Sequence, residues 1–580
     1  MKKILSLALL LLPLAGNAQA PDFKELTDSK PKDAKEIWEK KAIAPQFRWG
    51  SIDVHYKKNN IPVEQLSNSW SSKAWRGERV NGQAILWSAK ALEDVSIEVS
   101  PLRSGKNMIP ASAVTSSFVR YVMTDELNKD GKGACGHRPD KTKYDSSIVA
   151  DILDARRSMD IEAYSSRPIW VNVWVPENAV SGIYKGTITV KGKNFKALSL
   201  PYQVTVSNRT LPQPSEWSFH LDLWQNPYSV ARYYNVPLWS KEHFDLMRPI
   251  MKMLANAGQK VITTTIMQRA WAGQTEDAFE SMVFRMKKID GTWSYDYTVF
   301  DRWVEFMMSV GINKQINCYT MVPWALKFDY FDQASNSTKY VNAKPGDQEY
   351  EDYWLPFLKD FAKHLKEKGW FSKAAIAMDE RAMNQMREAF KLIFKADPDY
   401  KISGAARYYP EIESNMYDLC LAYGDTLPTA VHERRMKEGK ITTVYTCCTE
   451  AYPNTFTFSA PAEAAWIPWH AVAGNYEGYL RWAYNSWTKS PLEDSRFRSW
   501  AGGDCYLVYP NASSIRLERM VEGVQDAEKI RILRNEFKRK GDKAKLKRLN
   551  DAVGRFKPEF LHGPNATEML NAGRKVLNSF

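Results

Sequence analysis

A short apolar segment in the second half of the chain ends in two adjacent carboxylates and reads Lys373-Ala374-Ala375-Ile376-Ala377-Met378-Asp379-Glu380. An apolar run of this length, bounded by charged residues, is typical of a buried β-strand. A helical pattern follows from about residue 384 to residue 394. The segment therefore predicts a strand that passes quickly into a helix, with both acidic side chains at the carboxyl end of the strand.

Segments of the same kind recur on both sides of it. The predicted strands cover residues 217–224, 260–267, 315–321, 374–380, 401–407, 418–424, 441–448 and 479–485. Helical stretches lie between several of them, at residues 244–257, 300–310, 353–368 and 384–394. Strand–helix alternation indicates parallel strands, and eight of them predict a (β/α)8 TIM barrel at residues 211–515. A ninth run, residues 505–509, is left over, either as a hairpin after the last strand or because one of the eight is miscounted.

The chain has a different pattern before and after this region. Between residues 84 and 206, β-branched and aromatic runs alternate with turn residues, and no long helical pattern intervenes. This spacing predicts an N-terminal β-sandwich domain at residues 21–210, which ends in a Pro-containing linker at residues 207–214. Residues 516–580 are helical and rich in Lys and Arg, and we expect this C-terminal segment to pack on the barrel.

The first twenty residues have the pattern of a secretory signal peptide. Lys2 and Lys3 precede a largely apolar run, residues 4–14, and Ala18-Gln19-Ala20 is a small-x-small cleavage site. The run is too short to span a membrane, and no later stretch of sequence is long enough. We therefore expect an exported protein, periplasmic or extracellular, whose mature chain begins at Pro21.

The composition narrows the class of protein. With 580 residues, 44% hydrophobic and 25% charged, the chain is predicted to be folded rather than disordered. The net charge of +13 comes with no nucleic-acid-binding motif, so no nucleic-acid partner is expected. The six cysteines lack a framework spacing, which favours buried thiols over disulfides. His432-Glu433 opens like a zinc-binding helix, but position 436 is Met, so we expect no metal and no cofactor.

Asp379 and Glu380 are the candidate catalytic residues. Active sites of such barrels lie at the C-terminal ends of the strands, which is where this pair stands. Two like charges this close raise the cost of ionising both, so the pKa of one carboxyl should rise. Such a pair suits a general acid beside a carboxylate that stays charged. The alternative is that the two residues cap the following helix, where acidic side chains are also favoured.

Polar and aromatic residues gather at the ends of the other predicted strands. Period-two alternation places His220, Asp222 and Trp224 on one face of the first strand, toward the barrel mouth. The further candidates for contact with substrate are Gln268, Tyr319, Tyr408, Tyr445, Trp482, Tyr484, Asn485 and Trp487. Aromatic faces stack on sugar rings while polar groups bind the hydroxyls, so these residues indicate a carbohydrate site.

Several motifs occur in a fixed order along the chain. They are Trp75-Arg76-Gly77-Glu78, Pro176 with Gly182-x-Tyr184-x-Gly186, Asp379-Glu380, Leu480-Arg481-Trp482-Ala483-Tyr484-Asn485, Gly503-Asp504 with Leu507-Val508-Tyr509-Pro510, and Ser514-Ile515-Arg516-Leu517-Glu518. This ordered set resembles glycoside hydrolase family 123, exported bacterial β-N-acetylgalactosaminidases. The resemblance covers most of the chain after residue 20, and it implies an enzyme that releases terminal β-linked N-acetylgalactosamine from glycans.

The resemblance also implies a retaining, exo-acting and substrate-assisted mechanism. The 2-acetamido oxygen of the substrate would attack its own anomeric carbon and form an oxazoline, an exception to the usual carboxylate nucleophile. Asp379 would orient the acetamido N–H, and Glu380 would act first as general acid and then as general base. Because neighbouring residues of an ideal strand point to opposite faces, the two carboxylates can converge only if the strand end is turned, and we predict that turn.

Two other functions stay open at this point. One is a non-catalytic carbohydrate-binding protein on the same scaffold, and the other is a glycosidase for another sugar that uses two ordinary carboxylates. The expected partner is a glycan in each case, with a terminal β-linked N-acetylhexosamine if the resemblance holds. The sequence leaves open the aglycone, the galacto or gluco configuration of the sugar, and the oligomeric state.

Overall fold

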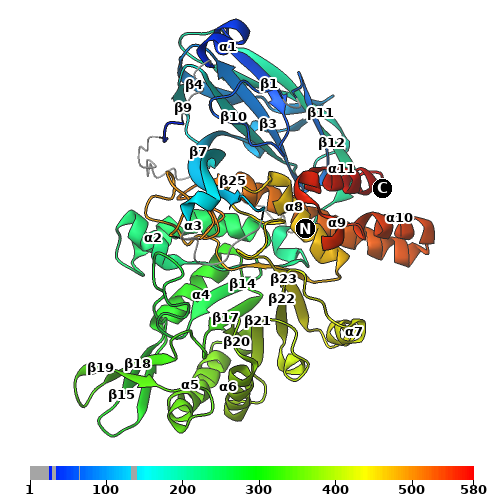
Figure 1. Ribbon diagram of the computed structural model, residues 1–580. Helices are drawn as coiled ribbons and strands as arrows, with labels where there is room; N and C mark the ends of the chain where they lie inside the picture. Colours follow the sequence, from blue (N-terminus) through cyan, green and yellow to red (C-terminus); the bar gives the residue numbers. More distant parts are fainter. Residues whose placement is uncertain (1–24, 29–33, 64–65, 132–139, 499) are drawn as a thin grey trace, which may run out of the picture.

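The computed structural model describes residues 25–28, 34–63, 66–131, 140–498 and 500–580. Figure 1 shows a strand-rich region, blue to cyan, above an α/β region, green to yellow, with the C-terminal helices beside the junction of the two. The expected signal peptide and its cleavage site lie outside the described residues. Within the described ranges, no helix has both the length and the apolar character that crossing a membrane requires.

Two sheets form the N-terminal region. The first has the strand order β1 (Gln46–Gly50), β3 (Arg79–Ser88), β10 (Ser165–Trp174), β7 (Val114–Asn128), β8 (Tyr144–Asp154) and β25 (Ser513–Ser514). The second has the order β2 (Trp70–Arg76), β12 (Leu198–Thr210), β11 (Gly182–Lys191), β4 (Leu92–Val99) and β9 (Ser158–Ile161), with β5 (Leu102–Ser104) and β6 (Asn107–Ile109) beside β11. Alternate side chains of both sheets, such as Val171, Val173, Ile188 and Val204, share one apolar core. The predicted β-sandwich is confirmed.

Eight parallel strands form a nearly closed barrel after the sandwich. In spatial order they are β13 (His220–Leu223), β24 (Gly478–Arg481), β23 (Ile441–Tyr445), β22 (Asp418–Ala422), β21 (Lys401–Ala405), β20 (Ala374–Met378), β17 (Gln315–Tyr319) and β14 (Val261–Thr265). The N–H of Lys260 donates to the carbonyl of Leu221 at 3.0 Å and connects the two end strands. Seven strands lie within predicted segments and β24 begins one residue before its own, so the predicted barrel is confirmed. The ninth run, residues 505–509, lies in the loop after β24 and adds no barrel strand.

Helices connect most of the strands on the outside of the barrel. They are α2 (Pro227–Tyr234), α3 (Lys241–Asn256), α4 (Thr298–Val310), α5 (Gln348–Glu367), α6 (Met383–Ala396), α7 (Thr429–Lys437) and α8 (Pro461–Ala473). The connection between β21 and β22 holds only a short 3-10 turn, Glu413–Asn415. These helices bury apolar stripes against the strands, which makes one large core around the barrel.

A small sheet that the sequence did not predict projects from the loops after β14 and β17. Its order is β16 (Trp293–Asp296), β15 (Phe284–Lys287), β18 (Lys327–Asp332) and β19 (Ser337–Asn342), and it extends to the lower left in Figure 1. Its strands are short and β19 is largely exposed, so they carry little of the apolar alternation that identifies a strand in sequence.

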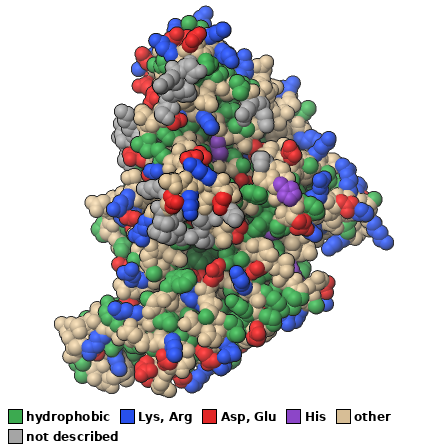
Figure 2. Space-filling model, viewed as in Figure 1, with side chains coloured by type: hydrophobic (Ala, Val, Ile, Leu, Met, Phe, Trp, Pro, Cys, Tyr) green, Lys and Arg blue, Asp and Glu red, His purple; other side chains and the backbone are tan. Residues whose placement is uncertain are grey.

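Helix α9 (Ile515–Lys540) connects the two regions. It packs on α8 of the barrel and also contacts β8 and β3 of the sandwich, and it is almost wholly buried from Ile515 to Ile530. Helices α10 (Lys543–Val553) and α11 (Ala566–Leu577) pack beside it, and α1 (Ala34–Lys41) lies at the far end of the sandwich. Exposed Lys and Arg side chains gather over the end of α9 and over α10, at the right edge of Figure 2.

The cysteines differ in part from the sequence prediction. Cys318, Cys420 and Cys505 are free and buried, in agreement with buried thiols, and Cys447 is half-buried with its Sγ 2.8 Å from Thr449 Oγ1. Cys448 is disulfide-bonded, so the prediction of a thiol is wrong for this residue. Cys135 lies outside the described residues. Disulfide formation follows from tertiary contact, which irregular cysteine spacing does not reveal.

Candidate active site

The adjacent carboxylates lie where strand β20 gives way to helix α6. The strand ends at Met378, the chain bends at Glu380, and α6 begins at Met383. The bend confirms the predicted turn, and it lets the side chains of Asp379 and Glu380 face one pocket. The N-cap residue of α6 is Ala382, and no side chain makes a cap hydrogen bond there. The helix-capping interpretation of the pair is therefore wrong.

Asp379 is the more buried of the two carboxylates. Its side chain is 14% exposed, and its Oδ1 lies 2.7 Å from Nη2 of Arg381. Burial and the nearby charge of Glu380 raise the pKa of Asp379 to about 6, although the Arg381 guanidinium opposes the rise. Burial thus opposes ionisation of the carboxyl that the resemblance casts as the permanently charged partner.

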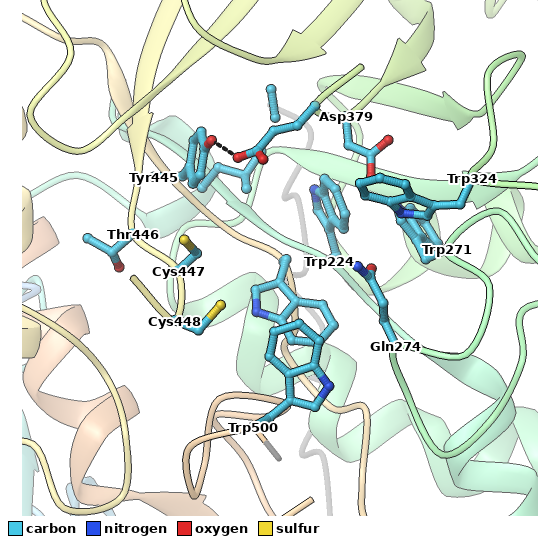
Figure 3. A pocket seen from close by; sticks show the side chains of 14 residues that line it. Trp224, Trp271, Gln274, Trp324, Asp379, Tyr445, Thr446, Cys447, Cys448 and Trp500 are labelled. Carbon is cyan, nitrogen blue, oxygen red and sulfur yellow. Dashed lines mark hydrogen bonds between the residues drawn. The ribbon is translucent and has the colours of Figure 1, made fainter. Parts of the chain in front are cut away.

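Glu380 lies at the open side of the pocket. Its residue is exposed, and the hydroxyl of Tyr445, at the end of β23, donates a hydrogen bond to its Oε1. This contact and burial raise the pKa of Tyr445 above its usual range, so the phenol keeps its proton. Figure 3 shows the hydrogen bond as a dashed line on the side of the pocket opposite Trp324. Glu380 is therefore held by a neutral donor while it remains accessible to a substrate oxygen.

Tryptophan side chains make up much of the pocket, which encloses about 710 Å³ including its open mouth. The rings of Trp224 and Trp271 are buried at its base with centroids 5.0 Å apart, and both contact Tyr319, at 4.6 and 5.1 Å. In Figure 3, Trp324, Trp271 and Gln274 lie on one side and Tyr445, Cys447 and Cys448 on the other. The pocket therefore presents indole surfaces for stacking beside two carboxylates, a combination suited to sugar binding.

Five of the sequence-predicted site residues line this pocket, namely Trp224, Asp379, Glu380, Tyr445 and Trp482. Their convergence from β13, β20, β23 and β24 follows from barrel closure, which brings the carboxyl ends of distant strands together.

Three further predicted residues are buried and do not line the pocket. Tyr319 packs against Trp224 and Trp271, and His220 Nε2 is 3.7 Å from Asp418 Oδ2. Asp222 is buried, and burial and the charge of Asp418 raise the pKa of its carboxyl well above the usual value. Of the residues placed on the inward face of the first strand, only Trp224 reaches the pocket.

The remaining predicted contacts lie away from the pocket. Gln268 lines a separate hollow beside β15 and β18, and Tyr408 is half-buried outside the pocket lining. Tyr484 donates to the carbonyl of Ile250 at 2.8 Å, and Trp487 donates to that of Val508 at 2.8 Å. Asn485 is fully buried and bonds to Asn226. The last three hold the barrel wall together through buried hydrogen bonds to neighbouring segments.

The pocket also contains residues that the sequence did not single out. They are Trp271, Gln274, Trp324, Ala405, Thr446, Cys447, Cys448, Leu480 and Trp500. Trp271 and Gln274 lie just beyond Gln268 in the same loop, and Arg381 directly follows the carboxylate pair. Their closeness in sequence to predicted site residues could have identified them. Trp324 and Trp500 lie in loops, where no periodic sequence pattern indicates which way a side chain points. Among the described residues, no three His, Cys, Asp or Glu side chains form a group that could hold a metal ion.

Known proteins match the chain along most of its length. The family model of the glycoside hydrolase 123 catalytic domain matches residues 224–533, and that of the glycoside hydrolase 123 N-terminal domain matches residues 49–192. A structure of a family 123 glycoside hydrolase from Clostridium perfringens, from a study of glycolipid glycan hydrolysis, has a TM-score of 0.82 and 26% identity. That alignment covers 92% of this chain and 98% of the other. None of the curated proteins compared matches.

Two other solved structures are much less similar. A family 5 xyloglucanase from Bacteroides ovatus has a TM-score of 0.27 and 8% identity over 79% of this chain and 98% of its own. A proposed glycoside hydrolase from Bacteroides vulgatus has a TM-score of 0.31 and 9% identity over 80% of this chain and 79% of its own. The assignment rests instead on the two family models, which span the sandwich and the barrel, and on the similar fold of the Clostridium enzyme. The chain belongs to glycoside hydrolase family 123.

Proposed function

We propose that this glycoside hydrolase is a retaining exo-β-N-acetylgalactosaminidase that works by substrate assistance. The observation that carries the proposal is the turn after β20, which directs two neighbouring carboxylates into one tryptophan-lined pocket. A mechanism with a carboxylate nucleophile needs two groups on opposite sides of the scissile bond. Adjacent residues suit a division of labour in which one serves the acetamido group and the other the glycosidic oxygen.

Asp379 is proposed to bind the acetamido group. As a carboxylate it accepts the N–H, which increases the nucleophilicity of the acetamido oxygen, and it stabilises the positive charge that develops as this oxygen bonds to the anomeric carbon. The bond between the anomeric carbon and the leaving oxygen breaks in the same step. With a pKa of about 6, Asp379 is ionised at neutral pH and loses this function as it becomes protonated in acid.

Glu380 is proposed to carry the proton. It gives a proton to the leaving oxygen in the first step, and it takes one from the water that opens the oxazoline in the second. Tyr445 fixes the orientation of the carboxyl through Oε1. The exposed position of Glu380 suits this role, because both the aglycone and the incoming water must reach it.

Glycolipid glycans are the substrate class that we favour. The Clostridium perfringens relative was studied for glycolipid glycan hydrolysis, and its fold matches this chain over 92% of the chain's length. An exported enzyme, as residues 1–20 suggest, would meet such glycans outside the cytoplasm.

The first test compares hydrolysis of 4-nitrophenyl β-N-acetylgalactosaminide with that of the gluco epimer. We expect release from the galacto substrate, retention of configuration in the product, and inhibition by the corresponding thiazoline, which mimics the oxazoline. A glycosidase with two ordinary carboxylates would cleave sugars without a 2-acetamido group and would resist the thiazoline. Binding of a glycolipid glycan without any cleavage would instead identify a carbohydrate-binding protein and contradict the proposal.

A further inference from the structure

Arg381 directly follows the catalytic pair and makes four contacts from a nearly buried position. Its side chain is 4% exposed, and its Nη2 lies 2.7 Å from Oδ1 of Asp379. Its Nε donates to the carbonyl of Val322 at 2.6 Å, and its Nη1 donates to the carbonyl of Glu380 at 2.6 Å. The guanidinium carbon lies 4.0 Å from the ring centroid of Trp324. One side chain thus joins the turn after β20 to the loop after β17.

Trp324 is the other end of this arrangement. It lines the pocket, and it is 54% exposed, the only tryptophan among the large exposed apolar residues of the described chain. A ring with more than half of its surface exposed has few packing neighbours, so its orientation depends on the specific contacts that it makes. The guanidinium provides such a contact, since arginine stacks on indole faces through cation–π attraction.

Asp379 depends on Arg381 in a different way. The titratable groups that face it are Arg381 and Glu380 from its own turn and Tyr319 from β17, and Tyr445 from β23 reaches Glu380. Burial and Glu380 both oppose ionisation of Asp379, whereas Arg381 favours it. A carboxylate in this environment without its guanidinium would hold its proton to higher pH.

We propose that Arg381 is a positioning residue that keeps Asp379 charged toward the acetamido group and, through the same guanidinium, holds Trp324 as a wall of the substrate pocket. The proposal rests on the proposed function of Asp379. It explains why a cation that never reaches the sugar is buried beside the catalytic turn. The proposal also predicts that substitutions can separate the two roles. The positive charge favours ionisation of Asp379, whereas the planar guanidinium makes the carbonyl and indole contacts.

The test compares Arg381→Met, Arg381→Lys and Trp324→Ala by the pH dependence of kcat/KM on the nitrophenyl substrate. In Arg381→Met we expect the acid limb to move up by about one pH unit or more, since an opposite charge at this distance shifts a carboxyl pKa by about 1–3 units. Arg381→Lys should move it by less than half as much but raise KM about threefold, as loss of a cation–π contact implies. Trp324→Ala should raise KM and leave the acid limb in place.

Uniform loss of kcat at every pH in Arg381→Met, with the acid limb unmoved, would overturn the proposal and leave Arg381 a purely structural role. If Arg381→Met does not fold, Arg381→Lys still decides the matter, because an unchanged KM contradicts the contact with Trp324. If the wild type cleaves no nitrophenyl sugar, the proposed function fails on its own. Titration of the Asp379 carboxyl by carbon NMR, assigned with Asp379→Asn, then tests Arg381 without turnover, and an unmoved titration in Arg381→Lys and Arg381→Met refutes the proposal.

Discussion

The pocket and the interface beneath helix α9 both contain buried charged side chains, but these charges are compensated to different extents. At the interface, Lys529 Nζ lies 2.6 Å from Glu78 Oε1, and Arg516 Nε lies 2.8 Å from Asp151 Oδ2, with all four side chains at most 6% exposed. In the pocket, Asp379 has one guanidinium beside it and a second carboxylate as its neighbour. Each of these two interface carboxylates has a cation beside it, whereas the two neighbouring carboxylates of the pocket share one guanidinium.

This difference separates residues that hold the fold from residues that act. A buried pair with a partner of opposite sign fixes how two elements dock, and it leaves little capacity for a ligand. A carboxylate with incomplete compensation is costly to ionise, and it gains most when a substrate supplies the missing hydrogen bond. Burial alone is therefore a poor guide to function, and the balance of charge around the buried group is a better one.

The largest effect is expected from Glu380→Gln, which removes proton transfer and leaves the shape of the pocket intact. General acid–base catalysis contributes about 10²–10⁴ in rate, so kcat/KM should fall by that range while the melting temperature changes little. Glu388→Gln on helix α6 is the matched control, because its ion pair with Lys391 is at the surface. Equal activity of the two variants would remove Glu380 from the mechanism.

A substitution at the interface should lower the free energy of unfolding, whereas a substitution in the pocket should lower the rate of hydrolysis. Lys529→Met leaves the Glu78 carboxyl buried without its cation, which typically costs about 3–5 kcal/mol. Denaturant unfolding followed by tryptophan fluorescence measures the loss, and the double variant with Glu78→Leu should recover much of it. A loss below about 1 kcal/mol would show that the pairing of this interface is not required.

Asp379→Asn should change how the stability of the folded protein depends on pH. The pKa of Asp379 is about 6 in the folded protein against about 3.9 in an unfolded chain, so the folded state binds the extra proton between these values. Wild-type stability therefore falls by about 2–3 kcal/mol from this group as pH rises from 4 to 7, and the Asn variant lacks that fall. Melting curves of both proteins across this range measure the difference. A constant gap between the two proteins would contradict the raised pKa.

The smallest effect is expected from Tyr445→Phe, which removes the hydrogen bond to Glu380 and keeps the ring. A hydrogen bond to a charged group is worth about 1.5–3 kcal/mol, so kcat/KM should fall about ten- to hundredfold. Tyr340→Phe on the exposed strand β19 is the control. No change in kcat/KM for Tyr445→Phe would mean that Glu380 is oriented by substrate rather than by the phenol.

The family motifs illustrate what sequence patterns can and cannot assign. Gly77 in Trp75-Arg76-Gly77-Glu78 has φ +76°, and a Cβ there would lie 2.5 Å from the carbonyl oxygen of Leu211. Glu78 pairs with Lys529 across the interface. Arg481 and Asp504, from two other motifs, form a fully buried ion pair at 2.5 Å. These motifs identify the family through buried contacts that hold the fold, one of them between the two regions, while the catalytic pair is only two residues long.

The helices, the strands and their order along the chain could be predicted from the amino-acid sequence. Apolar periodicity is a short-range property, so eight strands, a sandwich before them and a carboxylate pair at a strand end could be predicted from neighbouring residues alone. Which side chains meet in the pocket depends on the tertiary structure, because Trp324, Trp500 and Tyr445 line it from loops and strands far apart in the chain. The tertiary structure also decided which carboxyl is hard to ionise, since burial and the distance to Arg381 depend on packing and not on local pattern.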